Sequence, residues 1–264
     1  MTESPEKQPR VVYSAIFGGY DTLRPVRPFD GCDFVCFTDD AASGAPGWQI
    51  RLVPKTGDSP ALLNRQFKML PHRFLPEYTE SLYVDGRVDL RRSPRPLFDK
   101  YLGHGGVAIP LHLDRDCAFE EAMYCVKDRL IPADVAEQQM ASYAAEGFPR
   151  HFGLTENNII FRRHHEAATV QLMEAWWSEY LNKARRDQVS LPYLSWKLGM
   201  AIEPVVEGPR LSGRYFSLRP HEVRSSSTAR RLGFYLQAYK HRSRLHRAAH
   251  TLYATVSRAL RQTR

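Results

Sequence analysis

The sequence predicts an α/β fold with a mainly parallel sheet. Short apolar runs alternate with helical patterns through about residue 210, and the chain contains no internal repeat. Acids or glycines follow three of the runs, at residues 18–21, 39–40 and 85–86. Ligands of open α/β sheets bind at the carboxyl ends of strands, so these positions are the first candidates for a site. The 264 residues suit one large domain or a domain with an appendage.

The first third of the chain is predicted to hold three strands. Residues 1–9 are polar with two prolines and are expected to form a disordered lead. Strands are predicted at residues 10–17, 33–38 and 48–53 from their β-branched and aromatic content. Glycines in the Gly18-Gly19-Tyr20-Asp21 loop allow close approach of a ligand, and they would equally serve a plain turn.

A helix follows. Ser59 is a good cap, Pro60 suits the first helical position, and Pro71 ends the pattern. Its apolar residues share one stripe, while Arg65 and Lys68 lie together on roughly the opposite face. These cations either form a solvated surface or point over the end of the next strand toward an anionic group.

The next strand lies within residues 81–90, SLYVDGRVDL, where an apolar run stops at Asp85 and turns on Gly86. An acid at this position can serve a ligand site, and it can equally be a solvated turn residue. The sequence alone leaves both interpretations open.

A helix near residues 94–102 and a strand near 107–111 lead to a cluster of ionisable side chains. We interpret this cluster as a site edge, or as a group of acids that caps the following helix. A metal held by the histidine with one of the aspartates is a further alternative. The cluster is His112, Asp114, Arg115 and Asp116.

Further helices are predicted at residues 133–146 and 165–180, with a strand at 158–161 between them. Trp176 and Trp177 are interpreted as core residues. The next helix is entered through residues 190–192 and ends at Gly199. Before it stand Asp187 and Gln188, which form either a local cap or an acid and amide that hold sugar hydroxyls.

Composition bounds the location. The four cysteines form no Cys-x-x-Cys pair and are predicted to be reduced packing thiols. No hydrophobic run reaches membrane-spanning length, and the N-terminus has no apolar signal core. These features predict a cytoplasmic protein.

Residues 223–264 form a strongly basic tail. Ten of the 37 Lys and Arg residues follow Glu222 and no acid does, so 27 basic residues face all 29 acids in residues 1–222. Apolar side chains recur at helical spacing at Leu245, Ala249, Leu252, Val256 and Leu260. A basic amphipathic helix predicts peripheral binding to an anionic membrane surface, which the family resemblance given below implies to be the inner face, or docking of a partner helix. Nucleic acid is not expected, because no recognised motif is present. The ten are Arg224, Arg230, Arg231, Lys240, Arg242, Arg244, Arg247, Arg258, Arg261 and Arg264.

Several motifs resemble, in the same order, a bacterial member of a glycosyltransferase-like family that was long described as a domain of unknown function. Plant relatives in that family include a mucilage-related glycosyltransferase-like protein and a protein described as an alkaline ceramidase. The resemblance covers about residues 10–205 and implies a Rossmann-like, type A glycosyltransferase domain over residues 10–222. The motifs are YSAIFGGYD, FVCFTDD, NRQFKMLPH, SLYVDGRVDL, RDCAFEEA and RRDQVSLPY.

The resemblance also implies roles for residues. The donor would be a nucleotide sugar and the acceptor a glycan or glycolipid, in a hexosyltransferase-like reaction with retention. Arg65 and Lys68 would face the diphosphate, and Asp85 would be the first acid of an Asp-x-Asp motif that binds manganese or magnesium. Base and ribose would lie by Phe17, Gly18, Tyr20 and Asp21, and the sugar by Asn157, Asn158, Asp187 and Gln188.

One departure from the family pattern concerns the metal. Arg87 replaces the second acid of Asp-x-Asp, and a metal held by Asp85 alone would be weakly bound. A guanidinium can instead grip a diphosphate through two hydrogen bonds. A nucleotide-sugar-binding protein without turnover is one alternative. A lipid amidase is another, although the chain has no Gly-x-Ser-x-Gly or His-Glu-x-x-His motif.

Overall fold

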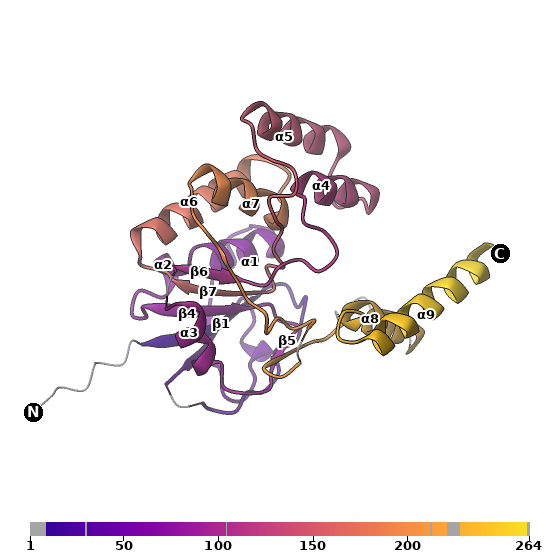
Figure 1. Cartoon of the computed structure of the whole chain (residues 1–264). Coiled ribbons are helices and arrows are strands. Elements are labelled where there is room, and N and C mark those ends of the chain that lie inside the picture. Colours follow the sequence, from indigo (N-terminus) through magenta and orange to yellow (C-terminus); the bar gives the residue numbers. More distant parts are fainter. Residues whose placement is uncertain (1–8, 30, 104, 212, 221–227, 263–264) are drawn as a thin grey trace, which may run out of the picture.

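A seven-stranded sheet forms the centre of the molecule (Figure 1). The computed structural model describes residues 9–29, 31–103, 105–211, 213–220 and 228–262. The strand order is β3-β2-β1-β4-β7-β6-β8, and within it only β7 runs antiparallel to its neighbours. The strands are β1 (Arg10–Ile16), β2 (Asp33–Thr38), β3 (Gln49–Leu52), β4 (Glu80–Val84), β6 (Val107–Ile109), β7 (Ile159–Arg163) and β8 (Glu203–Pro204). The predicted α/β class with a mainly parallel sheet is confirmed.

Helices cover both faces of the sheet, and the predicted elements are mostly found. Ser59 caps the helix α1, its hydroxyl accepting a hydrogen bond from the Leu62 amide. A second, small sheet pairs β5 (Val88–Leu90) with β9 (Phe216–Leu218). The helices are η1 (Ala41–Ser43), α1 (Pro60–Met69), α2 (Pro71–Phe74), α3 (Arg95–Tyr101), α4 (Ala118–Lys127), α5 (Ala133–Ala145), α6 (Ala167–Asn182), α7 (Asp187–Lys197), α8 (Thr228–Tyr239) and α9 (Arg244–Gln262).

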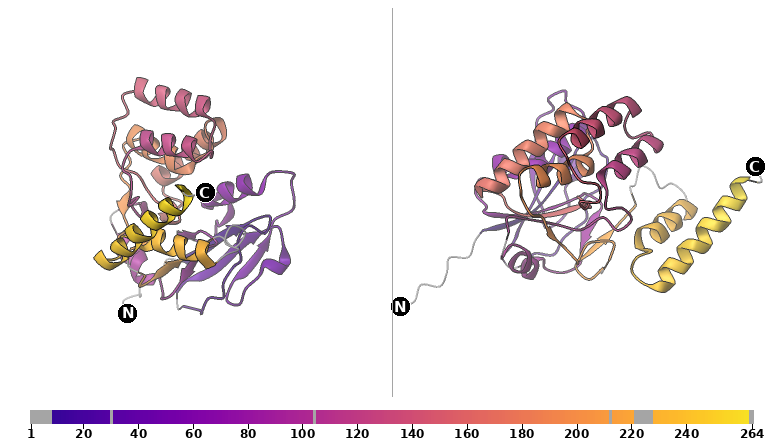
Figure 2. Two further views of the ribbon diagram at one scale, coloured as in Figure 1. Left: turned by 90° about the vertical axis from the view of Figure 1, so that its right-hand side faces the viewer. Right: turned by 45° about the horizontal axis from the view of Figure 1, so that its top comes forward.

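Alternating side chains of β1 face two different cores. Val11, Tyr13 and Ala15 join a large core made with α1, α6 and α7, whereas Val12 joins a core made with α3 and the small sheet. Figures 1 and 2 show these two layers on opposite sides of the sheet. Burial on both faces explains why the strand is a continuous apolar run. Trp176 is fully buried in the large core, as predicted.

One edge of the sheet collects the polar chain segments. β1 and β4 are parallel, so the residues after Ile16 and Val84 emerge at the same edge. β7 is antiparallel, so its beginning lies there too, and the Asp85 amide donates to the Asn158 carbonyl at 2.9 Å. The topology therefore brings three distant loops together.

The helix after residue 186 begins earlier than predicted. It starts at Asp187 rather than at residues 190–192, with Pro192 inside it. Asp187 therefore belongs to the first turn of the helix, and the preceding Arg185 and Arg186 lie just outside it. Pro192 has no N–H, so the Gln188 carbonyl four residues earlier receives no intrahelical hydrogen bond from it.

The basic tail forms a hairpin of α8 and α9, and it is fastened to the body. Tyr239 is buried, and its hydroxyl donates to the Leu218 carbonyl at 2.7 Å and accepts from the Leu218 amide at 2.8 Å. The expected lead at residues 1–8 and the expected boundary at residues 222–223 lie outside the described residues. Among the described helices, none is both long and apolar enough to cross a bilayer.

Candidate functional site

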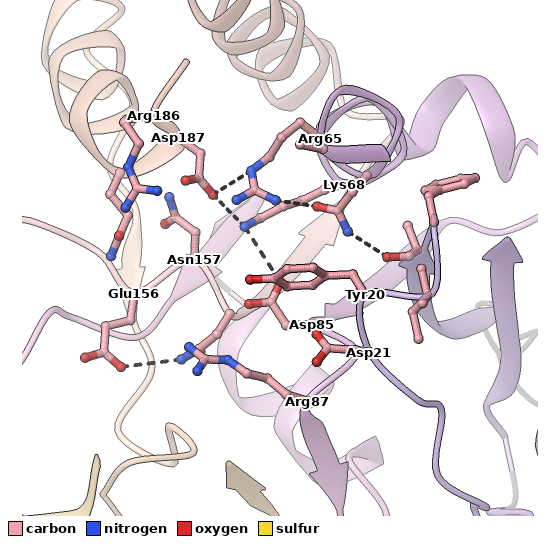
Figure 3. Close-up of a pocket in the computed structure, with 18 of the residues that line it drawn as sticks. Tyr20, Asp21, Arg65, Lys68, Asp85, Arg87, Glu156, Asn157, Arg186 and Asp187 are labelled. Carbon is pink, nitrogen blue, oxygen red and sulfur yellow. Dashed lines mark hydrogen bonds and ion pairs between the residues drawn. The ribbon is translucent and has the colours of Figure 1, made fainter. Parts of the chain in front are cut away.

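A cavity of about 560 Å³ opens at the edge of the sheet where the loops meet (Figure 3). Its walls come from the ends of β1 and β4, the start of β7, one side of α1 and the beginning of α7. Basic and acidic side chains both line it. The basic residues are Arg65, Lys68, Arg87, Arg186 and Arg210, and the acidic residues are Asp21, Asp85, Glu156 and Asp187.

The centre of the cavity is a buried charge network around Asp187. Its carboxylate Oδ2 lies 2.6 Å from Lys68 Nζ and 3.4 Å from Arg65 Nε. Lys68 is 2% exposed and Asp187 is 4% exposed. Burial alone would raise the pKa of Asp187, but Arg65, Lys68 and Arg186 outweigh burial and hold that pKa well below its ordinary value. Asp187 is therefore an anion with fixed position.

Two neighbours fix the position of this network. The Trp176 indole donates to the Asp187 carbonyl at 3.0 Å, which holds the first turn of α7 against α6. Gln188 donates through Nε2 to the Thr155 carbonyl at 3.1 Å, so its amide oxygen remains as an acceptor beside the cavity. Arg65 and Lys68 of α1 both line the cavity at the end of β4. Because Lys68 is buried, the alternative of a solvated surface does not hold for it.

Asp85 sits at the end of β4, as the sequence placed it. Its Oδ1 accepts a hydrogen bond from the Tyr83 hydroxyl at 2.9 Å and lies 4.0 Å from Lys68 Nζ. Asn64 donates to the Tyr83 hydroxyl at 3.3 Å and to the Ala15 carbonyl at 2.6 Å. Figure 3 shows Asp85 between Lys68 and Asp21. These contacts hold β1, β4 and α1 together behind the cavity.

The segment before β7 supplies buried polar atoms. Glu156 forms an ion pair with Arg210, and burial raises the pKa of Glu156 despite that pair. Asn157 accepts from the Thr155 hydroxyl at 2.7 Å, whereas its Nδ2 has no hydrogen-bond partner in the described part of the chain. Asn158 Oδ1 is likewise buried without a partner there. Because unsatisfied buried polar groups are costly, both amides are suited to a polar ligand.

Two arginines of the cavity have no acidic partner. Among the described residues, neither Arg87 nor Arg186 has a carboxylate oxygen within 4.0 Å, and the Nε of each is buried without a hydrogen bond. The Arg87 guanidinium lies 5.8 Å from the ring of Phe234 in α8. Neither guanidinium is held in a close ion pair, although Arg186 acts on Asp187 at longer range, so both can also bind an anionic ligand.

The loop after β1 takes part unevenly. Phe17, Tyr20 and Asp21 line the cavity, and the largely buried Phe17 side chain also packs on Phe67 with ring centres 5.5 Å apart. Gly18 adopts a φ of +62° and its amide donates to Asp39 at 3.0 Å, outside the residues that line the cavity. The predicted roles of Phe17 and Gly18 in binding a base stay predictions, with Phe17 at the cavity wall and Gly18 outside the lining. Gly18 instead shapes the turn.

The expected site edge at residues 112–116 is only partly at the cavity. His112 lines it, whereas Arg115 turns away to pair with Glu121 at 2.6 Å and Asp116 pairs with His151 at 2.7 Å. Asp114 is held by Arg210, Lys240 and His241. The metal alternative stays a prediction: among the described residues His112 belongs to no group of three ligand side chains, and Asp114 and Asp116 are both engaged in pairs.

His112 makes stability depend on pH. Burial, reinforced by Arg115 and Arg210, lowers the pKa of His112 to about 4, and burial lowers that of His164 to about 4 as well. A histidine with a lowered folded pKa stabilises the fold above its unfolded pKa near 6.5, and this contribution is lost as pH falls. We expect the free energy of unfolding to drop by about 1 to 2 kcal/mol per histidine from pH 7 to pH 5. Urea titrations at both values would measure it. His112→Asn should reduce the drop, and an unchanged drop would contradict this assignment.

Asp85 is a poor centre for a divalent metal. Arg87 stands two positions after Asp85, where the second acid of the motif would be, and Lys68 Nζ lies 4.0 Å from Asp85 Oδ1. A metal at Asp85 would therefore be repelled by cationic side chains. In the described residues, one group of three ligand side chains lies close enough to share a metal, namely Cys117, Glu120 and His151. That group lies outside the cavity lining. All four cysteines are free and buried.

Several cavity residues escaped the sequence analysis. Arg186 precedes Asp187 directly, and Asn64 lies one turn before Lys68, so spacing along α1 and α7 could have suggested both. Arg210 carried no local signal, because only the fold brings it to Glu156. Gly86 has a packing role: a Cβ there would lie 2.9 Å from Ile16 Cδ1 and 3.0 Å from the Asp21 Cβ.

Comparison with solved structures finds glycosyltransferases at low sequence identity. Mouse xyloside xylosyltransferase 1 in its apo form is 9% identical with a TM-score of 0.46, covering 77% of this chain and 87% of that one. The galactosyltransferase LgtC, in complex with donor and acceptor sugar analogues, is 12% identical with a TM-score of 0.43, covering 77% and 76%. The bifunctional glycosyltransferase WbbM in its apo form is 10% identical with a TM-score of 0.49, covering 90% and 45%.

Sequence comparison gives a firmer assignment. No curated protein sequence matches the chain significantly. A family profile described as "TOD1/MUCI70, glycosyltransferase-like domain" matches residues 48–207, which is more than half of the chain and includes α1, the Asp85 strand end, the start of β7 and α7. The chain therefore belongs to the TOD1/MUCI70 glycosyltransferase-like domain family.

Proposed function

We propose that the protein is a glycosyltransferase that moves a sugar from a nucleotide-diphosphate donor to a glycan or glycolipid acceptor. The observation that carries the proposal is the cavity at the sheet edge, where buried amides lie beside two arginines that form no close ion pair with a described carboxylate. A diphosphate needs such cations, and sugar hydroxyls need such amides and carboxylates. The glycosyltransferase-like family supports the reaction class.

We assign the diphosphate to the arginines rather than to a metal. Among the described residues, Arg87 and Arg186 have no carboxylate oxygen within 4.0 Å, while Arg65 lies 3.4 Å from Asp187. A guanidinium offers a planar pair of donors that matches two phosphate oxygens. Arg87 also stands where the second acid of an Asp-x-Asp motif would be, so the cation replaces the metal that this acid would help to hold. Asp85 then orients Tyr83 and Lys68.

The chemistry requires charge stabilisation at two points. The bond between the anomeric carbon and the diphosphate oxygen breaks with its electron pair passing to the diphosphate, and the acceptor oxygen forms the new bond and loses a proton. Arg87 and Arg186 stabilise the departing diphosphate. Asp187 and the Gln188 amide oxygen line the same cavity, and we assign them to the sugar, which they orient as positive charge develops on its anomeric carbon.

Retention fits the state of the carboxylates. Inversion needs a basic carboxylate opposite the leaving group, and Asp187, the carboxylate that we place at the sugar, is a poor base because its pKa is held low by Arg65 and Lys68. In the proposed route the acceptor proton therefore passes to the departing diphosphate oxygen on the same face of the sugar. Proton NMR of the fresh product would report its anomeric configuration. An inverted product would overturn this part of the proposal.

Thermal unfolding with nucleotides tests the function first. We expect one nucleoside diphosphate and its sugar conjugate to raise the melting temperature on the order of 5 °C at saturating ligand, because a ligand that binds only the folded state stabilises it. The rise should be the same with EDTA and with manganese. A rise that needs manganese would return the metal to Asp85, and no rise with any nucleotide would reject the donor class.

A turnover assay separates the second candidate. The uneven match of the loop after β1 and the absence of the second motif acid leave room for a protein that binds a nucleotide sugar without transferring it. Release of nucleoside diphosphate from the stabilising donor, followed with a coupled assay, supports a transferase. Stabilisation without release, across a panel of glycan and glycolipid acceptors, supports the binding protein.

A further inference from the structure

The exposed side of α9 carries an apolar stripe. Leu245, Leu252 and Val256 are 83%, 68% and 50% exposed, and Ala249 lies between them on the same side of the helix. The opposite arrangement would be normal, since an amphipathic helix usually buries its apolar side against the body. The side chains of residues 258–262, including Leu260, lie outside the described part of the chain.

The side of α9 that faces α8 is occupied by polar and aromatic residues. His246, His250 and Tyr253 are partly buried, and a Cβ on Gly233 of α8 would lie 2.6 Å from the Tyr253 hydroxyl. The hairpin is therefore closed without using the apolar stripe. Nothing else in the described structure covers Leu245 or Leu252.

Basic side chains lie beside the stripe. Arg244, Arg247 and Leu252 line one shallow groove on the exposed side of α9. No acid follows Glu222 in the sequence, so the hairpin contains no negative side chain to balance these arginines. Apolar side chains next to uncompensated cations are complementary to the surface of a bilayer that contains anionic lipid.

The hairpin is rigidly tied to the rim of the cavity. Arg210 of the cavity donates to the Ala238 carbonyl of α8 at 3.2 Å, and Asp114 holds Lys240 and His241 at 2.7 Å each. Phe234 of α8 stacks near Arg87. Figures 1 and 2 show α8 and α9 standing off from the sheet as one unit. A membrane that binds α9 would therefore lie close to the cavity opening.

We propose that the α8–α9 hairpin docks the protein on a bilayer containing anionic phospholipid, with the apolar stripe of α9 in the interface. The arginines of the groove meet lipid phosphates, and the alkyl stems of these side chains extend the apolar contact. A cavity held beside a membrane favours an acceptor glycan carried on lipid. That last step rests on the proposed transferase function, whereas docking itself does not.

Vesicle flotation tests the docking without any need for turnover. The full chain is mixed with vesicles of phosphatidylglycerol and phosphatidylcholine, or of phosphatidylcholine alone. We expect flotation with the first and not with the second, and a loss of flotation as salt is raised, since screening weakens surface attraction. Leu252→Gln with Val256→Gln should weaken binding at least about tenfold, because two apolar side chains leave the interface.

A matched double variant controls for the loss of exposed apolar side chains as such. Leu52→Gln with Val206→Gln makes the same two substitutions at positions of the body that are 60% and 59% exposed, and it should change binding less than about threefold. Equal loss in both double variants, or equal flotation with both vesicle types, would overturn the proposal. A dimer in sedimentation velocity that becomes a monomer in the stripe variant would also overturn the proposal, because a second copy of the chain would then cover the stripe. Stripe-dependent flotation of a protein that binds no nucleotide would keep the docking and reject the transferase.

Discussion

Asp187→Asn is expected to reduce kcat/KM by at least about 100-fold, because a fixed anion that orients the sugar contributes several kcal/mol in the transition state. The same change should lower stability. Lys68 is 2% exposed and would lose its ion-pair partner, which costs about 3–5 kcal/mol when one member of a buried pair is removed. Steady-state kinetics and urea unfolding measure the two effects separately.

Two further variants distinguish these effects. Glu77→Gln removes an ion pair with Arg51 at the surface and should cost less than about 1 kcal/mol. Asp187→Glu keeps the charge but shifts it, so it should recover stability more than activity. Because the pKa of Asp187 is lowered in the folded state, its stabilisation is present above about pH 4 and is lost at lower pH, and Asp187→Asn should remove that acid dependence. Unchanged turnover in Asp187→Asn would reject its placement at the sugar.

Arg87→Ala is expected to weaken donor binding about 10- to 100-fold and to lower kcat as well. Arg87 has a buried Nε with no partner and no described carboxylate within reach, so its charge is available to the diphosphate. A hydrogen bond to a charged group contributes about 1.5–3 kcal/mol. Isothermal titration with the nucleoside diphosphate, in EDTA, would measure the loss. Arg87→Lys should lie between wild type and alanine, because an ammonium cannot form the two-pronged contact.

Arg92→Ala is the matched control for Arg87→Ala. Arg92 is exposed, carries the same charge and does not line the cavity, so we expect less than about a twofold change in donor binding. Arg87→Asp is the sharper test, since it restores an Asp-x-Asp motif. It should abolish binding in EDTA and recover part of it with manganese. Manganese dependence in the wild-type protein, with none gained in Arg87→Asp, would refute the arginine-for-metal assignment.

Local patterns in the sequence were enough to predict the main elements of the domain. The buried run of β1, the Ser59-Pro60 start of α1 and the strand that ends at Asp85 follow from short-range rules on burial, capping and strand composition. The same rules placed α9, because its apolar spacing is helical. Asp85, Arg65 and Lys68 were candidates for one site because each stands at or beside the end of a strand.

Partners that are distant in the sequence were decided only by tertiary structure. The sequence allowed Lys68 to be solvated or directed at a ligand, and its burial against Asp187 depends on α7 packing beside α1 and α6. Arg115 was a candidate for the edge of the site, but in the structure it pairs with Glu121 of α4. Arg210 pairs with Glu156, which lies 54 positions away in the sequence, and no local sequence pattern predicts a pair with that separation. Propensity and capping act over a few residues, whereas charge pairing depends on which surfaces the whole chain brings into contact. The sequence therefore determined the elements and the ends of the strands, and packing determined which charges are neutralised and which are left for a ligand.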